Sequence, residues 1–151
     1  MLRTRFSEAL KDGLKTKKDR VVHTVRLVMA ALKDKDIAAR PKGVTAIPDE
    51  EILQMMTGMV KQRRESIEMF EKGGRPELAR GEQEEIDIIQ SFMPKQMDEA
   101  EQTAAIKAAI AETGAASVKD MGKVMAALKE KYAGQMDFSK ASGLVKQNLS
   151  G

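Results

Sequence analysis

Apolar side chains recur every three or four residues through most of this 151-residue chain, and nowhere do they alternate as in a half-buried β-strand. That spacing places them along one side of an α-helix, and such a helix must bury this side against a neighbour. Aromatic residues, which sheets favour, make up only 3% of the chain. The chain is therefore predicted to be all-α.

Gly and Pro residues divide this pattern into seven segments. Four helices are predicted near 2–14, 19–35, 49–72 and 77–93, with a loop from Asp36 to Pro48 and a stop at Pro94. Three more are predicted near 99–113, 118–132 and 138–149. The prediction is a four-helix bundle over residues 1–95 and a three-helix unit over 96–151. Two pairs have the spacing of a capping box, Asp98 with Glu101 and Ser117 with Asp120.

Charge is distributed unevenly along the chain. Residues 1–42 carry 12 Lys and Arg against 5 Asp and Glu, whereas residues 43–95 carry 7 against 11. A basic N-terminal hairpin attracts phosphates, membranes or acidic partners, and the alternative is a lysine-rich solvated face. The chain contains no Cys and one His, His23, so neither a metal site nor a cofactor is expected.

The first twenty residues carry charges throughout and contain no apolar block, so they do not resemble a secretory signal. No apolar run approaches the ~18 residues that span a membrane. From these features we expect a cytoplasmic protein without a membrane partner.

Two groups of residues are candidates for chemistry. Arg63 falls within the apolar stripe of its helix, and Glu82 and Glu85 fall within the stripe of the next helix. These three residues predict a partly buried ion-pair cluster that fixes helix register, with an anion or substrate site as the alternative. Gly122 and Lys123 open the sixth helix, where a glycine indicates either close helix packing or the close approach of a ligand.

Three stretches together resemble the YqeY family: KQRRESIEMFEKGGRPELARGEQEEIDIIQSFMPKQM at 61–97, DMGKVMAALKEKYAGQMDFSKASGLVKQNL at 120–149, and VRLVMAALKDKDIAAR at 25–40. The second stretch is similar to a module that YqeY proteins share with the tail of the B subunit of the tRNA-dependent amidotransferase. The resemblance covers nearly the whole chain. It departs from the family pattern at Ala126, where a Gly usually follows the GKVM motif.

The resemblance implies two helical bundles, the larger one first, and a C-terminal module that binds the body of tRNA. In the amidotransferase a separate catalytic domain performs the chemistry, so this chain is not expected to be an enzyme by itself. A carbon–nitrogen ligase label, with glutamine as amido donor, would come from family similarity alone. Lys119, Gly122 and Lys123 would meet the RNA, and the scarcity of aromatic side chains favours recognition of RNA shape over base stacking.

Three functions therefore stay open. The first is a non-catalytic tRNA-binding or amidotransferase-associated protein. The second is an adaptor that holds a protein partner in Met-rich helical grooves, although the stripe of Met55, Met56 and Met59 is itself predicted to be core. The third is an enzyme whose site contains Arg63 and the two carboxylates.

Overall fold

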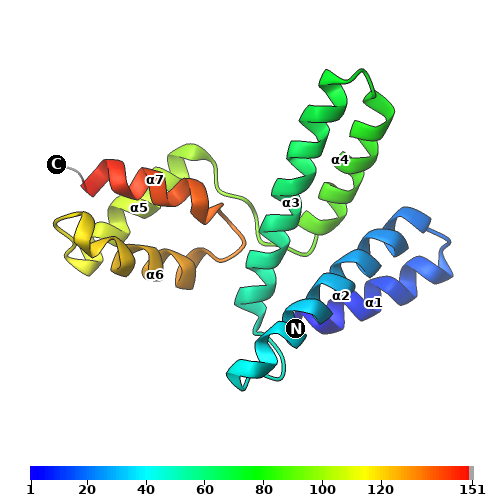
Figure 1. The fold of residues 1–151 in the computed structure, drawn as a ribbon, viewed down its shortest axis with the longest axis horizontal. Coiled ribbons are helices and arrows are strands. Elements are labelled where there is room, and N and C mark those ends of the chain that lie inside the picture. The colour runs from blue at the N-terminus through cyan, green and yellow to red at the C-terminus, as the bar shows by residue number, and fades with distance from the viewer. Residues whose placement is uncertain (150–151) are drawn as a thin grey trace. The chain divides into compact units, whose positions relative to one another are not determined.

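The computed structural model describes residues 1–149, which contain seven α-helices, two short 3₁₀ turns and no strand (Figure 1). The prediction of an all-α chain is confirmed. In chain order the elements are α1 (Leu2–Lys15), α2 (Asp19–Ala39), η1 (Arg40–Lys42), α3 (Asp49–Lys72), α4 (Pro76–Gln90), α5 (Glu99–Thr113), η2 (Val118–Asp120), α6 (Met121–Tyr132) and α7 (Phe138–Leu149).

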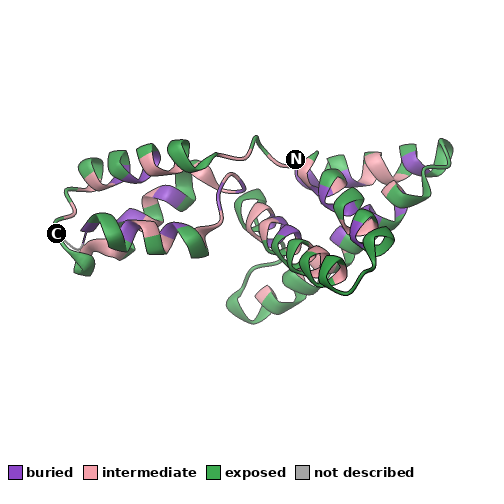
Figure 2. Ribbon diagram, turned by 90° about the horizontal axis from the view of Figure 1, so that it is seen from above, coloured by how far each residue is buried: buried purple, intermediate pink, exposed green. Residues whose placement is uncertain are grey.

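The chain divides into two compact units, and each has a hydrophobic core of its own. The first unit, Met1–Pro94, contains α1 to α4, and the second begins at Lys95 and contains α5 to α7. In both units the buried positions lie on the inward-facing sides of the helices, as amphipathic spacing requires (Figure 2).

In the N-terminal unit two helical hairpins pack through one pair of helices. α1 lies against α2, α3 lies against α4, and α4 also packs on α2 (Figure 1). α2 and α3 contact each other much less, so the unit is open along that side. All four helices contribute fully buried side chains, namely Phe6, Val25, Val28, Ile52, Met56, Ile86 and Ile89.

The ends of α1 and α4 meet through an aromatic pair. Phe6 is fully buried and lies edge-on to Phe92, with ring centroids 5.0 Å apart. Arg5 stacks over the Phe92 ring and donates hydrogen bonds to the carbonyl oxygens of Phe92 and Ser91. These carbonyls are free because α4 ends at Gln90, a few residues before the predicted end.

Leu14 and Leu78 continue the apolar spacing of their helices but lie outside the core. Leu14 is 53% exposed, and the neighbouring Gly13 is buried instead, where a β-carbon would come within 3.0 Å of Val22 Cγ2. Leu78 is 43% exposed in the first turn of α4. At both positions the helix has just begun or is about to end, so the periodic pattern continues past the region that another helix covers.

The C-terminal unit begins with the capping box that the sequence predicted. Glu101 N donates to Asp98 Oδ1 at 2.8 Å, and Asp98 N donates to Glu101 Oε1 at 3.4 Å. Gly114, in the left-handed conformation with φ of 65°, ends α5. The core beneath is formed by fully buried side chains from all three helices: Ile106, Val124, Leu128, Ala141 and Val145.

A polar clamp holds the loop between α2 and α3. The two Nη atoms of Arg3 donate to the two carboxylate oxygens of Asp36 at 2.8 and 2.9 Å. The same carboxylate accepts from Ile47 N at 2.9 Å, and Ile47 O accepts from Arg3. These bonds keep Asp36 inside a helix, which explains why α2 continues to Ala39 and the loop starts later than predicted.

The clamp predicts an acid-sensitive component of stability. The hydrogen bonds from Arg3, followed by the one from Ile47 N, lower the pKa of Asp36 from 3.8 to about 2. This stabilisation is complete above pH 3.8 and is lost as the pH falls toward about 2, because the unfolded chain takes up the proton first.

Urea unfolding of the wild type and Asp36→Asn at about pH 5 and about pH 2.5 tests this prediction. We expect the difference in stability between the two proteins to shrink at the lower pH. Asp34→Asn, an exposed position on the same helix, should follow the wild type at both values. A constant difference between wild type and Asp36→Asn would contradict the prediction.

Candidate functional site

The residues predicted to contact RNA lie together at the start of α6. Lys119 is in η2, and Gly122 and Lys123 are in the first turn of α6. All three are exposed, and neither lysine forms a salt bridge with any residue that the structure describes. The turn therefore presents two ammonium groups to solvent.

The predicted capping box at Ser117 does not form. The Ser117 side chain makes no capping hydrogen bond, and the Asp120 carboxylate instead accepts from Ala116 N at 3.0 Å. This bond, with further contributions from the Ser117 backbone and the Lys123 charge, lowers the pKa of Asp120. Asp120 N also donates to Ser117 O, and Met121 N donates to Val118 O. These three amides are therefore occupied and cannot bind an anion at this turn.

Gly122 has no packing reason to be glycine. A β-carbon at this position would meet no other atom within 4 Å, so no neighbouring helix comes close. Glycine inside a helix costs up to ~1 kcal/mol relative to alanine. Packing within the C-terminal unit therefore does not explain the glycine at this position.

The second candidate site is a charged cluster around Glu85. The structure pairs Arg63 Nε with Glu85 Oε2 at 3.0 Å, and the two side chains are only 13% and 11% exposed. Arg63 also donates to Met59 O. On the opposite side, Arg20 Nη1 and His23 Nε2 each lie 3.6 Å from Glu85 Oε1. One carboxylate of α4 is thus shared between groups from α2 and α3.

The cluster differs in membership from the one expected. Glu82 is half-buried but makes no hydrogen bond or salt bridge within residues 1–149, whereas Glu84 pairs with Arg20 at 3.2 Å. Sequence analysis missed Arg20 and noted His23 only as an isolated histidine. Their spacing of three residues places them on one face of α2 and was the available signal.

This arrangement suits a group that links neighbouring helices better than it suits a reaction centre. Both oxygens of Glu85 face cationic groups, so the carboxylate is not available as a base. The described part of the chain contains no group of three or more His, Cys, Asp or Glu residues that could hold a metal ion. Nor does it contain a helix long and apolar enough to cross a membrane.

Comparison with known proteins gives a match over almost the whole chain. A family model described as Yqey-like protein matches residues 3–149. Altered inheritance of mitochondria protein 41, mitochondrial, from Eremothecium gossypii is 36% identical over 88 residues, which are 58% of this chain and 46% of that protein. Proteins of the same name from Lachancea thermotolerans and Saccharomyces cerevisiae are 33% identical over 85 residues and 30% identical over 84 residues. Each alignment covers 56% of this chain, and 43% and 44% of those proteins.

The chain spans less than half the length of these three relatives. Their names contradict the cytoplasmic location that was predicted from the sequence, and that prediction is wrong. It rested on the lack of an apolar signal segment and of a membrane span. Neither feature bears on import into mitochondria, whose transit peptides are amphipathic and Arg-rich.

The Glu85 cluster predicts unequal effects of two glutamate substitutions on the same helix. Glu85→Ala leaves the Arg63 guanidinium nearly buried without a counter-ion, and we expect a loss of about 3 kcal/mol in the free energy of unfolding. Glu82→Ala removes no hydrogen bond or salt bridge to a described residue and should stay within about 0.5 kcal/mol of the wild type. Urea unfolding followed by circular dichroism measures both, and equal losses would show that Glu85 does not hold the helices together.

Proposed function

Because the chain belongs to the YqeY-like family, we propose that it is a non-catalytic protein that binds the body of tRNA through the turn at the start of α6. The proposal assigns RNA binding to a three-helix module, α5 to α7, that follows a four-helix unit, α1 to α4. An association with the tRNA-dependent amidotransferase would follow from the shared module and not from a reaction centre in this chain.

The observation that carries the proposal is the exposed Gly122. A glycine that no packing requires lies between two unpaired lysines, Lys119 and Lys123, on the outer face of a helix. Without a side chain at this position, an RNA backbone can come close to the helix while the ammonium groups contact its phosphates. Such contacts respond to charge and shape and carry little base specificity.

The N-terminal unit offers a second basic surface for the same ligand. Lys15, Lys17 and Lys18 surround the exposed turn between α1 and α2, and none forms a salt bridge with a residue among 1–149. Lys17 adopts a positive φ of 58°. These lysines account for part of the basic surplus of residues 1–42 and would strengthen binding to any polyanion.

The enzyme alternative receives no comparable support. Glu82 makes no ion pair with Arg63, and both oxygens of Glu85 are paired with arginines. A pair of carboxylates acting as acid and base requires two groups with different protonation states near one substrate. The cluster does not provide that pair.

Charge reversal at the α6 turn should weaken tRNA binding in a salt-dependent manner. We expect the wild type to bind total tRNA and Lys119/Lys123→Glu to lose most of that affinity. Removing two phosphate contacts should also reduce the slope of log K against log salt by roughly 2. Filter binding or fluorescence anisotropy at several salt concentrations measures both quantities.

The control for this experiment carries the same change in net charge. Lys107/Lys146→Glu alters two exposed lysines on α5 and α7, and it should retain most of the affinity. Equal losses in both variants would show that only overall charge matters. No binding by the wild type at low salt would remove the RNA proposal and leave the fold unaffected.

Gly122→Ala separates the effects on folding and binding. Alanine has open space at this position and a higher helix propensity, so the C-terminal unit should gain up to ~1 kcal/mol of stability. The added methyl group should nevertheless weaken tRNA binding. Gly143→Ala is the matched control, since it lies in α7 with equally open surroundings and should gain stability without loss of affinity. Unchanged binding by Gly122→Ala would contradict the role of this glycine.

A further inference from the structure

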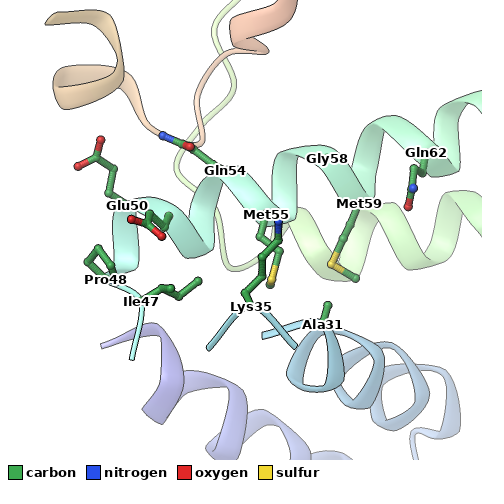
Figure 3. A pocket seen from close by; sticks show the side chains of 11 residues that line it. Ala31, Lys35, Ile47, Pro48, Glu50, Gln54, Met55, Gly58, Met59 and Gln62 are labelled. Atoms are coloured by element: carbon green, nitrogen blue, oxygen red, sulfur yellow. The ribbon is translucent and has the colours of Figure 1, made fainter. Parts of the chain in front are cut away.

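A groove of about 730 Å³ lies in the N-terminal unit where α2 and α3 diverge (Figure 3). One wall is the C-terminal half of α2, the other is the first half of α3, and the loop residues Ile47 and Pro48 close one end. The groove exists because α4 packs on both α2 and α3, so those two helices do not close on each other.

Methionine side chains lie at the floor of the groove. Met59 points across the groove toward Ala31, and Met55 lies one turn away on α3 (Figure 3). The prediction that this stripe is core is confirmed for Met55 and Met56, which are buried, while Met59 is partly buried and packs against the core. Unbranched thioether side chains can adjust to the shape of an incoming apolar surface.

At the centre of the α3 wall, Gly58 contributes no side chain to the groove. It lies in the middle of α3, is exposed, and a β-carbon there would meet no other atom within 4 Å. Packing inside this unit therefore does not require glycine, although glycine weakens the helix. A small residue at this point allows the backbone of another helix to approach closely.

The rim of the groove is polar and unpaired. Lys35 rises from the α2 wall, and Glu50, Glu51, Gln54 and Gln62 follow the α3 wall. In the described part of the chain, none of these five side chains makes a hydrogen bond or salt bridge. The carboxylates gather at one end of the groove, opposite a single ammonium group.

We propose that this groove binds an amphipathic α-helix of a partner protein. The stretch from Glu51 to Gln62 covers about 17 Å of α3, which matches three turns of a bound helix. Apolar residues of that helix at i, i+4 and i+7 would contact the methionine floor. A basic residue of that helix would pair with Glu50 or Glu51 and an acidic residue with Lys35.

Charge distinguishes this site from the proposed RNA surface. Two carboxylates at one end of the groove repel a phosphate backbone, whereas the α6 turn presents lysines. The two sites lie in different units and use different chemistry. The groove proposal therefore does not depend on RNA binding.

A display library of helical peptides of about 14 residues tests the proposal. The library is selected on the full-length protein, and individual binders are then measured by fluorescence anisotropy. Gly58→Gln places a bulky polar side chain in the groove without a clash. Gly143→Gln makes the same exchange at an exposed helical position outside the groove and serves as control.

We expect the selected peptides to share apolar residues at i, i+4 and i+7 with a basic residue near one end. They should bind the wild type and Gly143→Gln alike and bind Gly58→Gln at least about tenfold more weakly, the loss expected for a disrupted interface contact. Peptides that bind Gly58→Gln as well as the wild type would overturn the proposal. So would a library without helical binders, a loss of tRNA binding in Gly58→Gln, or self-association of the chain that this variant abolishes.

Discussion

The ion pairs of the Glu85 carboxylate are the interactions on which the arrangement of the N-terminal unit depends. α4 brings this carboxylate between α2 and α3, where it meets Arg63 from one helix and Arg20 and His23 from the other. Such a group is costly to bury alone, and here it has charged partners from two neighbouring helices. Because α4 supplies the bridge, α2 and α3 do not need to meet, and the groove between them stays open.

Each of the two surfaces for which we propose binding contains an exposed glycine. Gly58 and Gly122 both lie inside helices, and neither is required by a close neighbour. One is surrounded by methionine and carboxylate side chains, the other by lysines. Each of these helices thus lacks a side chain at one exposed position. The surrounding charges are opposite in sign, so the two surfaces suit different kinds of ligand.

Local patterns were sufficient to predict the helices, because amphipathic spacing and the breaks at Gly and Pro are properties of short segments. The facing positions of Arg63 and Glu85 could be anticipated in the same way. The contacts of Arg20 and His23 could not be predicted, since they depend on how α2 crosses α4.

Asp36 shows a similar limit. Its bonds to Arg3 and Ile47 extend α2 into a segment that Pro41 and Gly43 had marked as loop. Whether Gly122 had a packing neighbour required the tertiary structure.

The contact between α1 and the end of α4 has a consequence for the order of folding. Arg5 and Phe92 are separated by 87 residues, and Phe6 finds its aromatic partner only at the last turn of the unit. During synthesis, α1 and α2 can form a hairpin early, but they cannot complete their core until α4 has left the ribosome. The core of the N-terminal unit is therefore completed late, by the segment that leads into the C-terminal unit.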